Sequence, residues 1–225
     1  MLNEIQNNIN HIIINADDFG LNSSVNRAIV DAFDKHFISS TTIMANMPSF
    51  EEAVSLAFKN RFESNIGAHL VLTDGSPLNN EISAINFLFS GKLTRKKTLK
   101  RELLFLNREK QQLIFKEFTA QIEKIKKAGI SITHLDTHHH VHESYKILEI
   151  LLEIRKIYNI SSIRIFNNCI QSSKIHKKAY RAVMNFYLKK NNAHFSDFFG
   201  SQTDVISKFK NITDPIKNRK IEIMV

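Results

Sequence analysis

The sequence predicts a single domain of the α/β class, in which parallel strands alternate with helices. From residue 11 onward, short β-branched runs alternate with segments whose apolar residues recur at helical spacing. No linker or shift in composition divides the 225 residues, and a chain of this length buries a substantial core without disulfides. The alternation fits either a barrel or a doubly wound sheet, and the periodicity alone leaves both open.

The first predicted elements are short apolar strands separated by amphipathic helices. His11 to Asn15 reads HIIIN, whose β-branched residues suit a buried strand. Apolar residues then recur at helical spacing from Val25 to Phe33, and Asn22 or Ser23 can cap this helix. The same reasoning predicts strands at 37–44 and 65–72 with a helix at 50–59 between them.

The rest of the chain continues this alternation after a turn-rich, basic stretch at 74–97. A long helix is predicted over 99–127, and Gly129 suits the turn that closes it. A strand at 131–137 and a helix from Ile147 to Tyr158 follow. The remaining elements are predicted as a strand at 162–165, a helix at 174–189, a polar connection, a helix at 204–217 and a strand at 220–224.

Composition excludes several classes of protein. The single cysteine, Cys169, excludes a disulfide framework and a Cys-rich zinc module. No apolar run approaches the ~20 residues of a membrane span, and residues 1–10 lack the organisation of a signal peptide, so we expect a cytoplasmic protein. The net charge of +9 is compatible with nucleic-acid binding. The basic cluster at 92–101 has no aromatic interleaving, however, so we favour lysines on solvated helix faces and expect no nucleic-acid partner.

Two adjacent carboxylates, Asp17 and Asp18, follow the first predicted strand. In α/β folds the carboxyl ends of strands are where ligands bind. Neighbouring carboxylates repel each other unless a cation or hydrogen bonds compensate. The alternative is that one aspartate caps the next helix while the other is solvated, and this pair alone leaves both interpretations open.

Five of the ten histidines lie within residues 134–142, which read HLDTHHHVH. Alternate side chains of an extended chain share a face. One side could therefore carry His134, Asp136, His138, His140 and His142. Imidazoles in a row with a carboxylate indicate metal binding or proton transfer, and a His-rich surface loop is the alternative.

His69 completes a candidate site only in combination with other residues. A lone histidine in an apolar strand is usually a core residue, but Asp18, His69 and His138 each lie at or near the end of a different predicted strand. If these ends converge, one carboxylate and two imidazoles form a facial site for a divalent cation and a water. Asp17 would then lie beside that water as a base.

Four motifs occur in an order and spacing that resemble one family of enzymes. They are NADDFGLN at 15–22, SSTTIMAN at 39–46, IGAHLVLTDGSPL at 66–78 and THLDTHHHVH at 133–142. These motifs resemble those of the YdjC/ChbG-like carbohydrate deacetylases, over residues 11 to about 165. The resemblance implies a TIM-barrel-like (β/α) fold, related to polysaccharide deacetylases, and removal of acetyl groups from N-acetylated sugars such as chitooligosaccharides.

The resemblance also implies roles for single residues. Asp18, His69 and His138 match the family's metal ligands, and Asp17 matches its general base. Magnesium is the ion usually assigned to the family, although two imidazoles suit zinc or another transition metal equally well.

Four further residues complete the expected site. Strand parity makes His140 the candidate that protonates the departing amine. Asp136 is expected to orient a ligating imidazole. Arg164, in the SIRI strand, and His142 are expected to bind substrate, although a structural ion pair is an equally good interpretation of Arg164.

The expected reaction is metal-dependent hydrolysis of the acetamide of an amino sugar, oligosaccharide or glycoconjugate. The cation activates water and polarises the carbonyl, while Asp17 accepts the proton. The basic charge would suit an anionic or membrane-associated glycolipid, and a homodimer is compatible with the sequence. The alternatives are another metal hydrolase on a similar barrel (a phosphoesterase or amidohydrolase) or a non-catalytic sugar- or nucleic-acid-binding descendant.

The end of the chain departs from the family pattern. Family members usually continue past the last strand with a His-Pro-containing segment, which the resemblance places just after Met224. The chain ends at Val225. We therefore expect one domain over residues 1–225 that lacks this segment, through truncation, a degraded gene or the use of a different acid.

Overall fold

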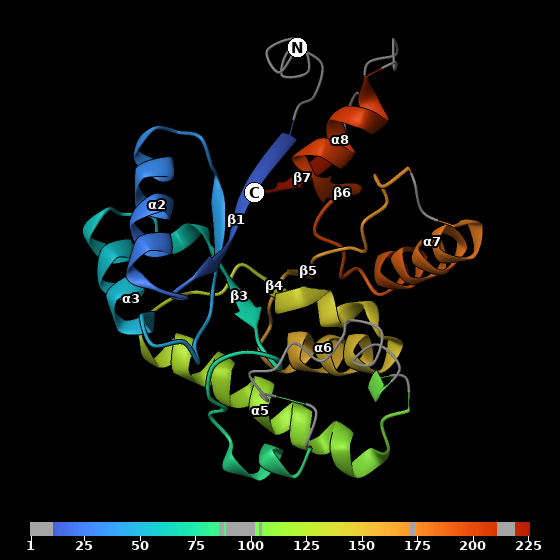
Figure 1. Ribbon diagram of the computed structural model, residues 1–225, viewed down its shortest axis with the longest axis horizontal. Helices are drawn as coiled ribbons and strands as arrows, with labels where there is room; N and C mark the ends of the chain where they lie inside the picture. Colours follow the sequence, from blue (N-terminus) through green and yellow to red (C-terminus); the bar gives the residue numbers. More distant parts are fainter. Residues whose placement is uncertain (1–10, 86–87, 89–101, 104, 172–173, 211–218) are drawn as a thin grey trace.

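The computed structural model describes residues 11–85, 88, 102–103, 105–171, 174–210 and 219–225, which form a parallel sheet surrounded by helices (Figure 1). The strands are β1 (His11–Phe19), β2 (Ser40–Ile43), β3 (Ile66–Leu70), β4 (His134–Thr137), β5 (Ser162–Ile163), β6 (Phe198–Ser201) and β7 (Lys220–Met224). The α-helices are α2 (Ser23–Asp34), α3 (Phe50–Lys59), α5 (Arg108–Lys127), α6 (Tyr145–Ile157), α7 (Ile175–Lys190) and α8 (Gln202–Phe209). The 3₁₀ segments are η1 (Glu63–Asn65), η2 (Asn80–Ala84) and η3 (His138–Glu143).

All seven strands run parallel, in the order β5-β4-β3-β2-β1-β7-β6, and the sheet curls into a half-barrel. The edge strands are not joined by a continuous ladder. A single parallel bridge pairs Ile163 of β5 with His194, just before β6, and the Asn168 amide donates to the Phe199 carbonyl at 3.2 Å. The α/β expectation is confirmed, whereas the described residues form an open seven-stranded half-barrel and not a complete TIM barrel.

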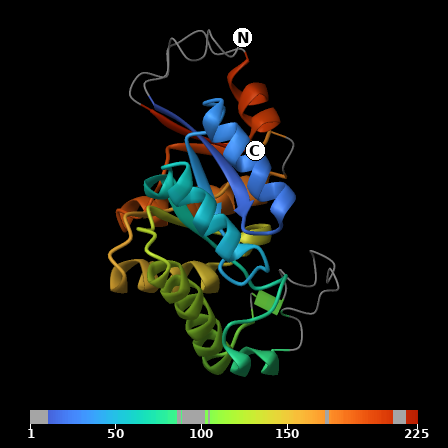
Figure 2. The ribbon, with the colours of Figure 1, turned by 90° about the vertical axis from the view of Figure 1, so that its left-hand side faces the viewer.

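The helices cover the outside of the curled sheet. Figure 1 shows α2 and α3 on one side, α5 and α6 below, α7 on the opposite side and α8 at the top, above β6 and β7. In Figure 2, α2 and α3 lie in front of the strands, and α5 extends well beyond the sheet. As the helical spacing predicts, α5 buries Ile114, Phe118, Ile122 and Ile125 completely. Among the described helices, none has the length and apolar character needed to cross a bilayer.

Most predicted elements are present, and three differ. β1 continues through both aspartates to Phe19. The predicted helix over 99–127 is broken at 105–107, because α5 begins at Arg108, where the Asn107 side chain caps it by accepting the Lys110 amide at 2.9 Å. Of the stretch before this break, Glu102 and Leu103 are helical, and residues 99–101 and 104 lie outside the described residues. β6 lies in what was predicted as a polar connection. The second half of the predicted helix over 204–217 lies outside the described residues.

Candidate active site

A β-bulge places both adjacent aspartates on the same side of β1. The pairing of β1 with β2 shifts between Ala16 and Phe19, and Asp18 has a left-handed backbone with φ +68°. In a regular strand, neighbouring side chains point to opposite faces, and a bulge re-aims one of them. Carboxylate oxygens of Asp17 and Asp18 therefore both lie near the ring of His69.

The turn after the bulge is held by a buried asparagine. Gly20 has φ +96°, and its amide donates to the Asn26 side chain at 2.7 Å. A Cβ on Gly20 would lie 3.1 Å from the Met44 carbonyl, so both backbone angle and space favour glycine there. The Asn26 amide also donates to the Glu52 carboxylate at 2.9 Å, which ties the turn to α3.

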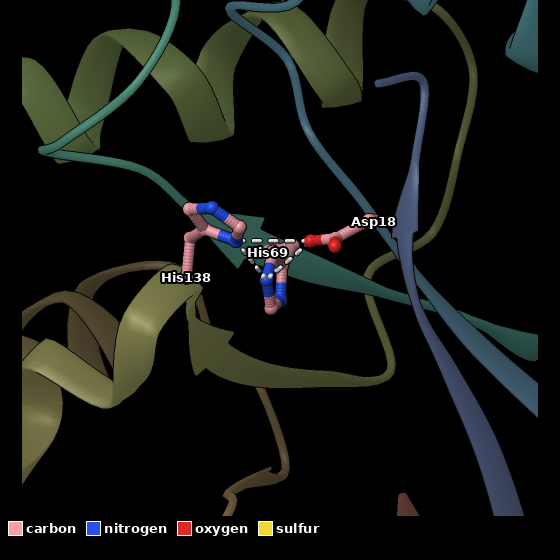
Figure 3. Close-up of side chains that lie close together, drawn as sticks. All are labelled: Asp18, His69 and His138. Atoms are coloured by element: carbon pink, nitrogen blue, oxygen red, sulfur yellow. Dashed lines mark hydrogen bonds and ion pairs between the residues drawn. The ribbon is translucent and has the colours of Figure 1, made fainter. Parts of the chain in front are cut away.

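Asp18, His69 and His138 bring three ligand atoms together, as the sequence predicts (Figure 3). Asp18 Oδ1 lies 3.1 Å from His69 Nε2 and 3.0 Å from His138 Nδ1, and the two nitrogens are 3.3 Å apart. Ligand atoms bound to one cation at about 2.1 Å, at right angles, lie about 3 Å from one another. The three atoms are therefore spaced as neighbouring ligands of one ion would be.

The chemistry of the donors also fits a cation. Asp18 Oδ1 is buried and accepts no hydrogen bond of good geometry, although two imidazole nitrogens face it. Burial acts to raise the pKa of Asp18, but the neighbouring imidazoles of His138 and His69 hold it well below its usual range. Such a carboxylate is ionised at neutral pH and suits a metal ligand.

Asp136 contacts His69, and its role in orienting a metal-ligating imidazole stays a prediction. His69 Nδ1 lies 2.6 Å from Asp136 Oδ1, and Thr42 Oγ1 donates to Asp136 Oδ2 at 3.2 Å. Because an ionised carboxylate can only accept, Nδ1 carries the proton and Nε2 faces Asp18. Burial acts to lower the pKa of His69, but the carboxylates of Asp136 and Asp18 outweigh burial and raise it to about 10.

Arg164 forms buried ion pairs, one of the two interpretations that the sequence leaves open beside contact with substrate. Its side chain is 0 % exposed and lies between three carboxylates. The guanidinium donates to both Asp17 oxygens at 2.8 Å and to Glu222 at 2.6 Å, and pairs with Asp136 at 2.5 Å. Burial opposes its charge, but these carboxylates raise the pKa of Arg164 well above its usual value. Arg164 therefore holds Asp17 in place from inside the half-barrel.

The predicted alternation of the histidines ends with β4. The strand stops at Thr137, and His139 and His140 both have left-handed backbones, with φ +55° and +53°. His142 is buried, with Nδ1 2.6 Å from the Thr137 hydroxyl, and its contact with substrate stays a prediction. Burial and the charge of Arg164 lower the pKa of His140, so its ring is mainly neutral at pH 7. Its role as proton donor stays a prediction.

His134 lies in the core at the start of β4 and not in the candidate site. Its ring stacks on Phe195, with centroids 4.1 Å apart, and Nδ1 lies 2.8 Å from the Thr133 hydroxyl. A Cβ on Gly67 would lie 2.6 Å from this ring, so β3 needs glycine beside it. Burial lowers the pKa of His134 to about 4, which keeps the ring neutral.

Three residues near the site carried no predicted role. Asp74 Oδ2 lies 3.1 Å from His138 Nε2, and buried Thr42 contacts Asp136. Glu222, an acid inside the apolar strand β7, pairs with Arg164, and burial raises its pKa to about 7 against that charge. Asp74 lies shortly after the end of β3, and the two aspartates of β1 lie at the end of that strand. The position of Asp74 near a strand end could therefore have indicated a role in the site. A charged residue between Ile221 and Ile223 was the corresponding signal for Glu222.

Proteins named carbohydrate deacetylase are similar in sequence to part of this chain. The carbohydrate deacetylase of Clostridium beijerinckii is 37% identical over 154 residues, which cover 66% of this chain and 58% of the relative. The carbohydrate deacetylase of Vibrio cholerae serotype O1 (strain O395) is 36% identical over 151 residues, covering 66% of this chain and 56% of the relative. The matched region thus spans less than two thirds of these relatives.

A solved structure and a family comparison cover more of the chain. A protein from Enterococcus faecalis V583, named for cellobiose-phosphate cleavage, has a TM-score of 0.68 and 24% identity, over 95% of this chain and 79% of that chain. This likeness shows a shared fold. The family described as YdjC-like protein matches residues 11–225, which include both aspartates, His69 and the histidine cluster. The chain therefore belongs to the YdjC-like protein family.

Proposed function

We propose that this protein is a metal-dependent hydrolase that removes N-acetyl groups from an amino sugar, an oligosaccharide or a glycoconjugate. The observation that carries the proposal is the convergence of Asp18, His69 and His138 at the carboxyl end of the sheet, with ligand atoms 3.0–3.3 Å apart. Relatives named carbohydrate deacetylase support the substrate class and the reaction.

The ion would be a divalent cation held by Asp18, His69 and His138. When bound, such an ion acidifies water and polarises a carbonyl group. Magnesium is expected from the family resemblance, whereas one carboxylate with two imidazoles is a donor set that also suits zinc or another transition metal. Elemental analysis of the purified protein distinguishes these ions.

Asp17 is the proposed general base. The Arg164 guanidinium donates to both of its oxygens at 2.8 Å, and the Asn15 side chain donates to Oδ1 at 2.8 Å. These bonds hold the carboxylate in one orientation. Its side chain is 14% exposed, which leaves it accessible to a reacting water. A fixed, accessible carboxylate within hydrogen-bond reach of the water is the arrangement that proton transfer requires.

His140 stays the proposed acid for the departing amine, and its lowered pKa means that it would need to gain a proton during the reaction.

Three predictions from the sequence concern the whole protein. They are a cytoplasmic location, peripheral contact with a glycolipid membrane and a homodimer.

Release of acetate from N-acetylated chitooligosaccharides, with a panel of divalent ions, tests the proposed function. We expect turnover by the wild type and a fall of about 10²–10⁴-fold in kcat for Asp17→Asn, because loss of a general base has effects of this size. Asp31→Asn, on the exposed face of α2, is the matched control and should retain full activity. Turnover of phosphate esters without acetate release would contradict the proposal.

A further inference from the structure

We propose that Asp74 is a positioning residue that holds the His138 ring so that Nδ1, and not Nε2, faces the metal site. This inference rests on the proposed metal site. It assigns a function to an acidic side chain in the loop after β3.

The two nitrogens of His138 face two different carboxylates. Nδ1 lies 3.0 Å from Asp18 Oδ1, inside the candidate site, and Nε2 lies 3.1 Å from Asp74 Oδ2. An ionised carboxylate accepts hydrogen bonds but cannot donate them, so contact with Asp74 keeps a proton on Nε2. The lone pair that remains for a cation is then on Nδ1, toward Asp18.

The same arrangement occurs at the other imidazole with the nitrogens exchanged. His69 points Nδ1 at Asp136, 2.6 Å away, and Nε2 at Asp18, 3.1 Å away. Metal-ligating histidines usually donate their second ring N–H to a carboxylate, a carbonyl or water. Asp74 therefore accepts the second ring N–H of His138, as Asp136 accepts that of His69.

Asp74 is itself held by the loop that carries it. The Asn46 side chain donates to the Asp74 carbonyl at 2.8 Å, and the Thr73 hydroxyl donates to Asp74 Oδ2 at 3.3 Å. Gly75 has φ +71°, and a Cβ there would lie 2.9 Å from Asn46 Nδ2, so the turn needs glycine. A residue that orients a ligand has to be fixed in this way.

A second interpretation of the same atoms is a separate cation between Asp74, His138 and His139, whose ligand atoms lie within 4.8 Å of one another. With an ion in the first site, His138 would have to bind through both nitrogens, which requires loss of both ring protons. A single cation with Asp74 as a proton-holding partner needs no such loss. The number of ions bound separates the two interpretations.

Titration of the metal-free protein with Co²⁺ tests the proposal without substrate. We expect one equivalent to bind to the wild type, and about 10- to 100-fold weaker binding by Asp74→Leu, as is usual for loss of such a partner. Asp74→Asn keeps an acceptor oxygen of similar shape and should lose less affinity. Glu81→Gln is the matched control, because Glu81 is exposed and its carboxylate pairs with Lys116 at the surface, 2.6 Å away.

Nitrogen NMR of ¹⁵N-histidine protein with Zn²⁺ provides a readout that a merely structural role would not change. We expect His138 to bind through Nδ1 and keep its Nε2 proton in the wild type, and to show mixed coordination in Asp74→Leu. Unchanged affinity and coordination in Asp74→Leu would overturn the proposal, as would two Co²⁺ equivalents with one lost in that variant, or no Co²⁺ binding by the wild type. Asp74-dependent Co²⁺ binding without acetate release would refute only the proposed deacetylase function.

Discussion

Asp18 shows how one residue's backbone determines what the site can hold. Its φ of +68° lies in the left-handed region, which costs a non-glycine residue on the order of 1 kcal/mol, although aspartate tolerates it better than most. The following turn keeps this conformation through the Gly20–Asn26 hydrogen bond. In a regular strand Asp17 and Asp18 would point to opposite faces, so the bulge is what brings the carboxylates of both to His69.

Buried neutral histidines predict a loss of stability in acid. Burial lowers the pKa of His134 to about 4, against 6.5 when exposed, so the unfolded chain binds its proton first as the pH falls. Its contribution to stability is therefore present above pH 6.5 and is lost toward pH 4. Between pH 7 and pH 4.5, we expect the free energy of unfolding of His134→Phe, measured by urea titration, to fall by about 2–3 kcal/mol less than that of the wild type.

The control for that experiment is His176→Gln, since His176 is exposed on α7. It should keep the pH dependence of the wild type. Equal pH dependence in His134→Phe and the wild type would show that His134 titrates normally in the folded protein.

At the scale of elements, α5 fixes the loop that follows β3. Buried Glu117 accepts the amides of Leu78 and Asn79, the latter at 2.8 Å, and the Gln121 side chain at 2.7 Å. Gln121 in turn pairs with both backbone groups of Val71, at 2.9 and 2.7 Å. The two side chains, one helical turn apart, clamp both ends of the segment that carries Asp74.

Replacing the clamp is expected to weaken both fold and site. In Glu117→Gln an amide group would face donors that need an acceptor, so we expect a loss of about 2–3 kcal/mol in the free energy of unfolding, measured in urea. Glu109→Gln, exposed in the first turn of α5, should lose less than about 1 kcal/mol. Similar losses in both variants would contradict a special role for the buried carboxylate.

The elements also show which features the sequence could predict. Apolar periodicity located α3 at its observed bounds and found the end of β4 at Thr137. It also found β1 and β3, but ended β1 at Asn15, before the aspartates, and β3 two residues late. Periodicity could not place the start of α5, which depends on a cap by a single asparagine. It also missed β6, because Phe198–Ser201 is a strand only through its pairing with β7.

Within the site, sequence reasoning failed where tertiary contacts decide the outcome. Strand parity could not extend past Thr137, because two consecutive left-handed histidines follow. The partners of Arg164 lie 147 and 58 residues away, at Asp17 and Glu222, and no local pattern indicates such pairs. Of the two interpretations that the sequence left open for Arg164, the burial of its side chain among carboxylates favours the ion pair, here with the proposed base.

On the scale of the whole molecule, the sheet order brings both ends of the described chain to the site. β7 lies between β1 and β6, so Glu222 reaches Arg164, which holds Asp17 on the neighbouring strand. The same curling places Asp17, Asp136 and Glu222 around one guanidinium, with Asp18 nearby against His69 and His138. This excess of carboxylates over permanent positive charge is what a bound divalent cation would offset.

The central claim is that Asp18, His69 and His138 share one divalent cation. Anomalous diffraction from crystals of the full chain grown with Zn²⁺, paired with Zn²⁺ stoichiometry in solution, tests it directly. The account predicts one peak bonded to all three side chains, and one equivalent that is lost in His69→Ala but retained in His176→Gln. An ion bound elsewhere, or binding unaffected by His69→Ala, would contradict it.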